Sequence, residues 1–288
     1  PRSRHRARVM SIAEALRGQL QQFTPQERRV ARVLLAGYPR AGLGSAAELA
    51  ASAGVSAPTV VRFARALGFG GYAELQAALI EEVSERHASP LSQAEQRRLA
   101  GPVPGNWLSD GVRTAATAIE ESLGAIPLSE LETAVALLAN PKLRVTAFGG
   151  RFSGFIARYL ILHLQQVRSG VRPQDPMLAA TDLIDADARD VVVIYDFRRH
   201  QLSTIHHARR LADAGAKIIC ITDPWLSPVA QVSTAVLPTS VQSTTPFDSA
   251  APAFVLTELL VGAVLDRIGD PAIERMRRWD EVTSSETE

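Results

Sequence analysis

The stretch VVVIYDFRRHQLST, residues 191–204, places charged side chains directly after a run of apolar ones. The apolar run is typical of a buried strand, and Asp196, Arg198 and Arg199 follow it at once. In α/β proteins, ligands bind at the carboxyl ends of parallel strands. Guanidinium groups hold carboxylates and phosphates in bidentate geometry. The stretch therefore predicts an anion site, provided that the neighbouring elements build a parallel sheet.

Strand-like and helix-like segments alternate through the second half of the chain. Continuous β-branched runs that alternate with helices predict a parallel sheet covered on both faces, and so an α/β domain. We expect strands at 143–149, 191–195, 217–222 and 234–238, and helices at 153–167, 202–215 and 249–269.

Two further loops reach the same edge of this expected sheet. The first, FGGRFSG at 148–154, leads from a strand into a helix and contains Gly149, Arg151 and Ser153. The other contains Asp248 and Ser249, whose principal expected role is to cap the helix that follows. A helix N-terminus offers backbone N–H groups to anions. A glycine at a strand-to-helix turn is by itself more often only a turn residue.

The first third of the chain predicts a series of short helices. Thr24 and Glu27, and then Ser45 and Glu48, have the spacing of capping boxes. Ser56 follows a glycine-containing turn and is expected to cap a third helix. A longer helix is thus followed by two short helices that are joined by a tight turn. This order is the helix-turn-helix pattern, and it predicts an all-α domain.

The third of these helices has two different faces at 100° per residue. Its core side holds Val60, Phe63, Ala64 and Leu67. Small side chains and two arginines on the other side suit the major groove of DNA, where arginine pairs with guanine or phosphate. The expected DNA-binding residues are Ser56, Pro58, Thr59, Arg62 and Arg65.

The net charge of +1 conceals an asymmetry between the two parts of the chain. Residues 1–87 hold 12 basic and 7 acidic side chains, 12 − 7 = +5, and residues 88–288 hold 19 and 23, 19 − 23 = −4. A basic first part favours double-stranded DNA as its partner. The alternative is a solvated helix face in a bundle that binds protein.

Residues 24–79 resemble the N-terminal domain of the RpiR/MurR-type transcriptional regulators. The segment AELAASAGVSAPTVVRFARALGFGGYAEL carries the resemblance. It implies a winged-helix-like or tri-helical DNA-binding domain with Ser56, Thr59 and Arg62 facing the DNA. It also implies that a sugar-isomerase-type (SIS) sensing domain follows.

Residues 120–265 resemble that SIS domain, above all in ARRLADAGAKIICITD and LSPVAQVSTAVLP. The resemblance implies a dimer-forming sensor of a phosphorylated sugar or related metabolite, held by a Ser-x-Ser-Gly-x-Thr loop. This chain departs from that loop. Asp196 and Arg198 replace the serines, Arg199 the glycine and Gln201 the threonine, and Arg151 stands where the first loop usually has a second glycine.

Three interpretations of this altered loop stay open. In the first, Arg151, Arg198 and Arg199 bind a phosphate or carboxylate metabolite. In the second, Asp196 pairs with an arginine and fixes the loop or fills the pocket. In the third, the arginines lie at a subunit contact. Clustered charges at such loops are often functional, but structural ion pairs produce the same pattern.

The rival function is a phosphosugar isomerase or related carbohydrate-derivative enzyme. Such chemistry needs a general base, and the candidates by residue type are His200, His206, His207 and Glu258. The altered loop and the DNA-binding pattern argue against catalysis, so we expect a regulator that is not an enzyme. The sequence contains no metal-ligand spacing and predicts no cofactor.

The expected organisation is a DNA-binding domain at 10–87, a linker at 88–106, a sensing domain at 107–270 and a tail at 271–288. Within the sensing domain, Ser129 and Glu132 predict another capping box. A single cysteine, Cys220, indicates a reducing compartment, and no apolar run reaches membrane-spanning length, so we expect a cytoplasmic protein. We expect it to bind palindromic operator DNA as a homodimer or homotetramer.

Overall fold

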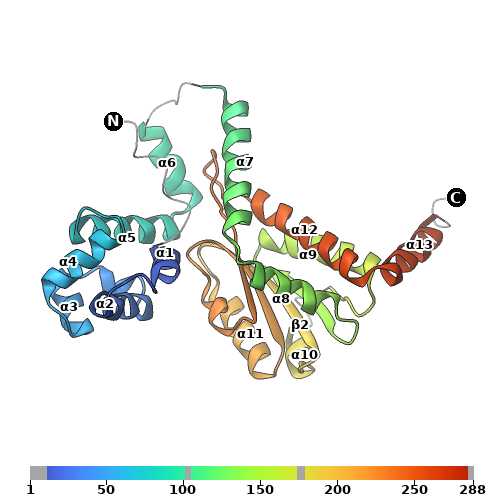
Figure 1. The fold of residues 1–288 in the computed structure, drawn as a ribbon. Coiled ribbons are helices and arrows are strands. Elements are labelled where there is room, and N and C mark those ends of the chain that lie inside the picture. Colours follow the sequence, from blue (N-terminus) through green and yellow to red (C-terminus); the bar gives the residue numbers. More distant parts are fainter. Residues whose placement is uncertain (1–11, 101–104, 174–178, 285–288) are drawn as a thin grey trace. The chain divides into compact units, whose positions relative to one another are not determined.

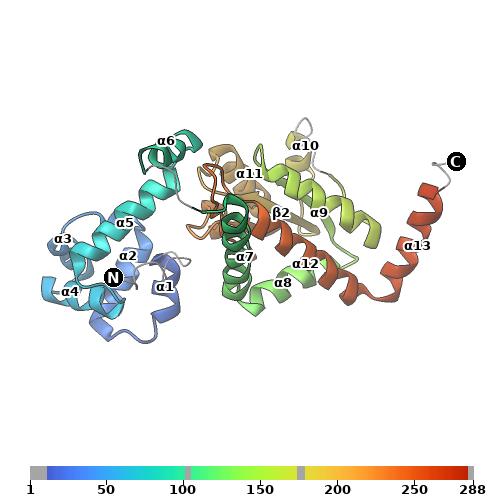
Figure 2. The same ribbon diagram turned by 90° about the horizontal axis from the view of Figure 1, so that it is seen from above.

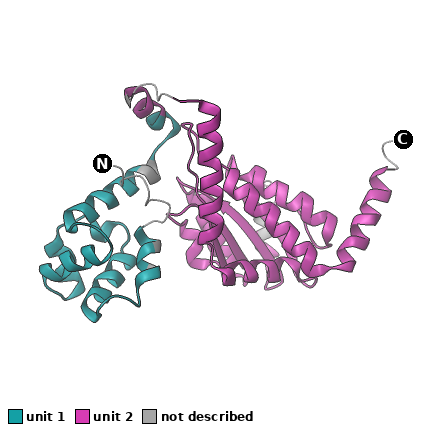
Figure 3. Cartoon of the chain, turned by 45° about the horizontal axis from the view of Figure 1, so that its top comes forward, with its two compact units in different colours: residues 1–93 teal, residues 94–288 magenta. Residues whose placement is uncertain are grey.

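The computed structural model describes residues 12–100, 105–173 and 179–284. The chain forms two compact units, residues 1–93 and 94–288, which are coloured separately in Figure 3. The first unit buries one hydrophobic cluster, and the second buries two, one on each face of its sheet.

The first unit is helical, as the sequence predicts. Thr24 and Ser45 accept hydrogen bonds from the backbone N–H groups of Glu27 and Glu48, which completes both predicted capping boxes. The helices, seen in Figure 1, are α1 (Ile12–Gln19), α2 (Pro25–Ala36), α3 (Ala46–Ala53), α4 (Ala57–Ala66) and α5 (Tyr72–His87), with a 3₁₀ turn, η1 (Arg40–Gly42), after α2.

The core of this unit lies where α2, α3, α4 and α5 meet. Phe63 of α4 is fully buried, and its ring centroid lies 5.3 Å from that of Phe23. Gly54 ends α3 in the left-handed region at φ 62°, where glycine is the residue without a Cβ penalty. This turn places α4 immediately after α3, which is the predicted helix-turn-helix connection.

The second unit is built on a four-stranded parallel sheet with the strand order β1-β2-β3-β4. All seven residues of β2 are buried, which confirms the central strand expected from the apolar run. The strands are β1 (Arg144–Gly149), β2 (Asp190–Asp196), β3 (Lys217–Thr222) and β4 (Ala235–Pro238).

Helices cover both faces of this sheet. Val191, Val193 and Tyr195 contact the layer that contains α8 and α9, and Val192 and Ile194 contact the layer of α11. The same layers are visible in Figures 1 and 2. The remaining elements are α7 (Trp107–Ala125), α8 (Leu128–Ala139), α9 (Ser153–Val167), α10 (Ala179–Ile184), α11 (Leu202–Asp213), η3 (Pro228–Val232) and α12 (Ala251–Ile268).

The expected linker and tail both contain a helix that the sequence pattern does not predict. Residues 88–106 include α6 (Pro90–Ala100), and residues 271–288 include most of α13 (Asp270–Ser284). The expected capping box of Ser129 and Glu132 is wrong, because α8 begins at Leu128 with Pro127 as its N-cap and Ser129 lies inside the helix. Within the described ranges, no single helix is long and apolar enough to cross a membrane. Only α7 and α8 taken together reach the length and apolar composition of a span, and they are bent by 86° relative to each other.

Candidate functional site

The exposed face of α4 is the candidate DNA-binding surface of the first unit. Ser56, Pro58, Arg62 and Arg65 are exposed, while Val60, Phe63 and Ala64 on the opposite side are buried, as predicted. Arg65 Nε donates to the carbonyl of Gly70 at 3.3 Å, which holds its stem against the turn after the helix. The exposed cations therefore lie on a helix whose other side is fixed in the core.

Thr59 does not lie on this exposed face, and the expectation that it does is wrong. The residue is 1% exposed, and its hydroxyl accepts a hydrogen bond from Arg62 Nη2 at 3.0 Å. The same hydroxyl lies 3.0 Å from the hydroxyl of Ser56 and donates to Gln26 Oε1 of α2 at 3.4 Å. Thr59 therefore supports Arg62 from behind and has no surface with which to contact a base.

Ser56 occupies the predicted N-cap position of α4 but does not cap it through its side chain. Its hydroxyl is engaged with Thr59, and the backbone N–H of Thr59 donates to the carbonyl of Ser56 at 2.9 Å. The first turn of α4 therefore offers few N–H groups to a phosphate. Pro58, which has no N–H, lies in this first turn and exposes an apolar ring there.

The loops after β1 and β2 form one continuous surface at the carboxyl edge of the sheet. Ser153 Oγ accepts from the N–H of Gly150 and donates to the carbonyl of Tyr195, both at 2.8 Å. A Cβ at Gly149 would lie 2.7 Å from Ser153 Oγ, so this position needs glycine. A Cβ at Gly150 would lie 3.6 Å from the side-chain nitrogen of Gln201, which places Gln201 beside the first loop.

Asp196 is buried, and it forms no ion pair with an arginine among the described residues. It is 4% exposed, and the hydroxyl of Ser227 donates to its carboxylate. Burial raises the pKa of Asp196, while the bond from Ser227 and the charge of His200 oppose that shift. The interpretation in which Asp196 pairs with an arginine is therefore wrong, because the carboxylate instead ties the end of β2 to the start of η3.

Arg198 is the arginine that is fixed by an ion pair, and its partner is Asp248. Arg198 Nη2 lies 3.1 Å from Asp248 Oδ1, and its guanidinium lies 4.9 Å from the ring centroid of Trp225. The Arg198 side chain is only 10% exposed. Burial raises the pKa of Asp248, and the charges of Arg198 and Arg199 oppose that shift. The ion pair thus connects the loop after β2 to the segment that precedes α12.

Asp248 and Ser249 do not act as the N-cap, which is Ala250. Ser249 Oγ nevertheless accepts from the N–H of Ala251 at 3.2 Å and so satisfies one donor at the helix start. The expectation that both residues cap the helix is thus wrong for Asp248. Ser249 is not the N-cap residue, but its side chain does bond a backbone N–H at the start of α12.

Arg151 and Arg199 are the exposed cations of this surface, and within the described residues neither forms an ion pair. Arg199 has φ 65°, a left-handed conformation that is uncommon for a residue with a Cβ. Because a non-glycine residue there is held by its surroundings at a cost of about 1 kcal/mol or more, such positions concentrate at functional loops. Arg151 and Arg199 are therefore the groups at this edge that can meet an anion.

The sequence interpretation missed a buried acid–base pair beside this surface. His200 Nε2 lies 3.0 Å from Asp223 Oδ2, and both side chains are almost completely buried. Asp223 also accepts from the N–H of Trp225 at 2.9 Å. Its position directly after the strand at 217–222 was the available signal, because that residue must reach the same edge as Asp196.

The structure places the four candidate general bases in different surroundings. His200 is held by Asp223, and His207 packs edge-on against Phe148 with ring centroids 5.1 Å apart. Glu258 accepts from the hydroxyl of Tyr159 at 3.0 Å on the exposed side of α9 and α12. His206 is an exposed residue of α11. Across the described residues, no cluster of three metal-ligating side chains is present.

Two family models match the chain in the order in which the two units occur. A model described as "Helix-turn-helix domain, rpiR family" matches residues 10–86, and a model of the SIS domain matches residues 137–263. The two matches cover the α4 surface and the carboxyl edge of the sheet, respectively.

Two curated proteins illustrate the similarity. The uncharacterized HTH-type transcriptional regulator YfhH of Escherichia coli is 25% identical over 211 residues, which cover 72% of this chain and 73% of YfhH. The HTH-type transcriptional regulator HexR of Pseudomonas aeruginosa is 37% identical over 76 residues, which cover 26% of this chain and 27% of HexR.

Solved structures share the fold. The NanR protein of Vibrio vulnificus, complexed with ManNAc-6P, matches with a TM-score of 0.55 at 18% identity, over 96% of this chain and 98% of NanR. The sugar isomerase domain of an RpiR transcription factor from Sphaerobacter thermophilus matches with a TM-score of 0.55 at 18% identity, over 60% of this chain and 97% of that domain.

Proposed function

This chain belongs to the rpiR family, with a helix-turn-helix domain joined to a SIS domain, and we propose that it binds operator DNA through α4 and senses a small anionic metabolite. The observation that carries the DNA-binding part is the exposed face of α4, where Arg62 is positioned by a buried hydroxyl. Named transcriptional regulators among the relatives support the same conclusion.

The proposed DNA-binding head inserts the first turns of α4 into the major groove. Arg62 pairs with a base or phosphate, and Arg65 contacts the DNA backbone. One such head offers few contacts, so two copies of the chain bind the two halves of a palindromic operator. A homodimer is the smallest assembly with that symmetry.

The proposed effector site is the carboxyl edge of the sheet, with Arg151 and Arg199 as the anion-binding groups. Ser153 and Arg198 are already engaged, by Tyr195 and Asp248, and so shape the site. The effector class is a phosphosugar, a sugar acid or another small carboxylate. The ManNAc-6P in complex with NanR, a protein that shares this fold, supports that class.

An experiment with the full chain tests both parts. Operator fragments selected from random DNA are bound to the protein and followed by fluorescence anisotropy, while sugar phosphates, sugar acids and small carboxylates are added one at a time. We expect a sequence-specific complex whose affinity changes with one of these compounds. Failure to select any sequence contradicts DNA binding, and turnover of a sugar phosphate favours the isomerase instead.

The proposed regulator works by a shift between two arrangements of the DNA-binding heads. An effector that binds one arrangement more tightly changes the spacing of the heads and thus their fit to the half-sites. The cytoplasm is the compartment in which such a protein meets both operator and metabolite.

A further inference from the structure

A second cluster of arginines lies at the opposite edge of the sheet from the proposed effector site. A pocket of about 500 Å³ is lined by Arg168, Arg267 and Arg275 together with apolar residues and one serine, and no carboxylate lines it. The other lining residues are Ala139, Pro141, Val167, Ser169, Ile268 and Pro271. Its size falls in the range of small-molecule sites, which is about 300–1,000 Å³.

The fold places this pocket at the amino edge of the sheet. α9 starts beside Gly149, where β1 ends, and runs back along the sheet, so its last residue, Val167, lies beside the start of β1. β1 has six residues, which corresponds to about 20 Å of strand between the two edges. The pocket is thus separate from the surface that contains Arg151 and Arg199.

Arg168 is a buried cation without a carboxylate partner among the described residues. It is 5% exposed and donates to the carbonyls of Leu138, Leu143 and Ser169. Those bonds use three of its five N–H groups. Burial lowers the pKa of Arg168, which reflects the cost of a charge removed from water. Buried charges in proteins are normally paired, so this position has capacity for an anion.

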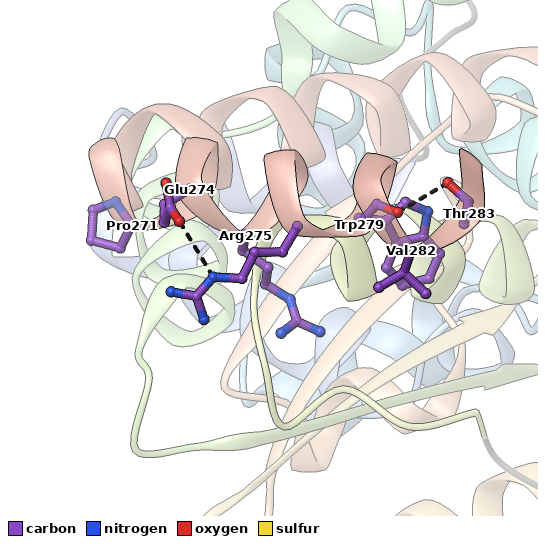
Figure 4. A pocket seen from close by; sticks show the side chains of 7 residues that line it. Pro271, Glu274, Arg275, Trp279, Val282 and Thr283 are labelled. Carbon is purple, nitrogen blue, oxygen red and sulfur yellow. Dashed lines mark hydrogen bonds and ion pairs between the residues drawn. The ribbon is translucent and has the colours of Figure 1, made fainter. Parts of the chain in front are cut away.

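The other two arginines bring further positive charge to the pocket. Arg275 Nε donates to the carbonyl of Gln165 at 2.8 Å, and Arg267 makes no hydrogen bond or ion pair within the described part of the chain. Figure 4 shows a neighbouring groove along α13, which is a different cavity from the arginine-lined pocket. Arg275 and Pro271 line both of them.

Capping of helix ends explains only part of this cluster. α8, α9 and α12 all end at this pocket, and each carboxyl end carries roughly half a negative charge, about 1.5 in all. Three guanidinium groups exceed that charge, and the partial positive charge at the amino end of α13 is met by Asp270 in its first turn. The residues that line the pocket carry three positive charges and no negative one.

We propose that this pocket binds a multivalent oxyanion, a phosphoryl-bearing small molecule, between Arg168, Arg267 and Arg275. The guanidinium groups hold the phosphoryl oxygens in bidentate geometry, and the apolar wall contacts the remainder of the molecule. The site is independent of operator binding and of the effector site.

The test uses the full chain with Arg151→Ala and Arg199→Ala, which removes the exposed cations of the effector site. Inorganic phosphate and then pyrophosphate are titrated at constant ionic strength, and binding is followed by the ³¹P line width and by the melting temperature. We expect saturable binding, tighter for pyrophosphate. Arg267→Glu should weaken it about tenfold or more, because the variant loses a charge-assisted hydrogen bond and places a negative charge beside the anion.

The matched control is Arg210→Glu, which makes the same charge change at an exposed position of α11. It should leave phosphate binding unchanged. Arg267→Gln removes the positive charge without adding a negative one. It replaces Arg267→Glu in the titration if the glutamate variant has a markedly lower melting temperature. Absence of saturable binding, binding that survives both Arg267 variants, or an equal loss in the Arg210 variant would each overturn the proposal.

Discussion

Arg62 of α4 donates a hydrogen bond from Nη2 to the buried hydroxyl of Thr59, across 3.0 Å. A long side chain that is held before it meets DNA loses less conformational freedom on binding. The proposed DNA-binding face therefore depends on a residue that is buried behind it.

The first prediction concerns this support. Thr59→Val keeps the shape of the side chain and removes the hydroxyl, so Arg62 and Ser56 lose their shared partner. We expect operator affinity to fall roughly three- to tenfold, in line with about 1 kcal/mol per hydrogen bond. Fluorescence anisotropy measures it. Thr59→Ser, which retains the hydroxyl, is the matched control and should bind within about twofold of the wild type.

The second prediction concerns Arg62 itself. Arg62→Ala should weaken operator binding by about 1–3 kcal/mol and reduce discrimination at one base pair of each half-site. Arg65→Ala should instead weaken specific and nonspecific DNA alike and lower the salt dependence by about one charge. Competition titrations against single-base variants separate the two outcomes. Equal loss on every sequence for Arg62→Ala would reassign it to a phosphate contact.

The third prediction concerns Arg199, whose backbone lies at φ 65°. Arg199→Gly and Arg199→Ala both remove the guanidinium and should abolish the effector response, while apo DNA binding persists. Only glycine relieves the backbone strain, so Arg199→Gly should be about 1 kcal/mol more stable than Arg199→Ala. Denaturant unfolding and an effector titration of the DNA complex check both statements. A response that persists in both variants would exclude Arg199 from the site.

The fourth prediction concerns Arg198 and its partner. Removing Arg198 leaves Asp248 without its ion-pair partner and frees the segment before α12. We expect Arg198→Ala to abolish the effector response by loss of site geometry, and Asp248→Asn to weaken the response less, because the cation remains. Thermal stability of each variant without effector shows whether the loss is local. Equal effects of both substitutions would show that the pair acts as a unit.

The fifth prediction is a pH dependence from Asp196. Burial raises its folded-state pKa above the unfolded value near 3.9, so the ionised form is less favourable in the folded protein. Below the unfolded-state pKa, Asp196 is protonated in both states and does not lower the free energy of unfolding. As pH rises from that value through the folded-state pKa, burial of the ionised carboxylate lowers the free energy of unfolding. Asp196→Asn keeps an acceptor for Ser227 and removes that cost.

Its measurement is the difference in melting temperature between Asp196→Asn and the wild type at several pH values. The variant should gain relative stability as pH rises through the folded pKa of Asp196. His200 and Asp223 lie close by, so Asp223→Asn is measured in parallel to separate their contribution. A difference that does not change with pH would contradict the prediction.

Local patterns predicted the fold because each depends on a few neighbouring residues. The continuous apolar run at 191–195 is enough to assign a strand buried on both faces, and β2 is buried throughout. The boxes at Thr24 and Ser45 form within one turn of helix, so they could be identified directly. α6 was missed because the helix is polar on most sides. α13 was missed because charged residues separate its apolar ones, although Ile273, Met276, Trp279 and Val282 recur every three residues.

The candidate site was less predictable because its contacts join distant residues. Asp196 takes its hydrogen bond from Ser227, 31 positions away, and Arg198 pairs with Asp248 of a different loop. A helical projection of α4 alone places Thr59 outward, but α2 contributes Gln26 at that spot. Such pairings follow from how the elements pack, and no single window of the sequence contains them.

Trp225 lies against the guanidinium of Arg198, and this contact gives the protein an optical readout. A cation over an indole changes its emission, so any ligand that draws Arg198 away alters the fluorescence of that one tryptophan. The chain has only two other tryptophans, Trp107 and Trp279, and both lie on helices outside the loops of the effector site. With those two replaced by phenylalanine, occupancy of the proposed site is measurable without a label.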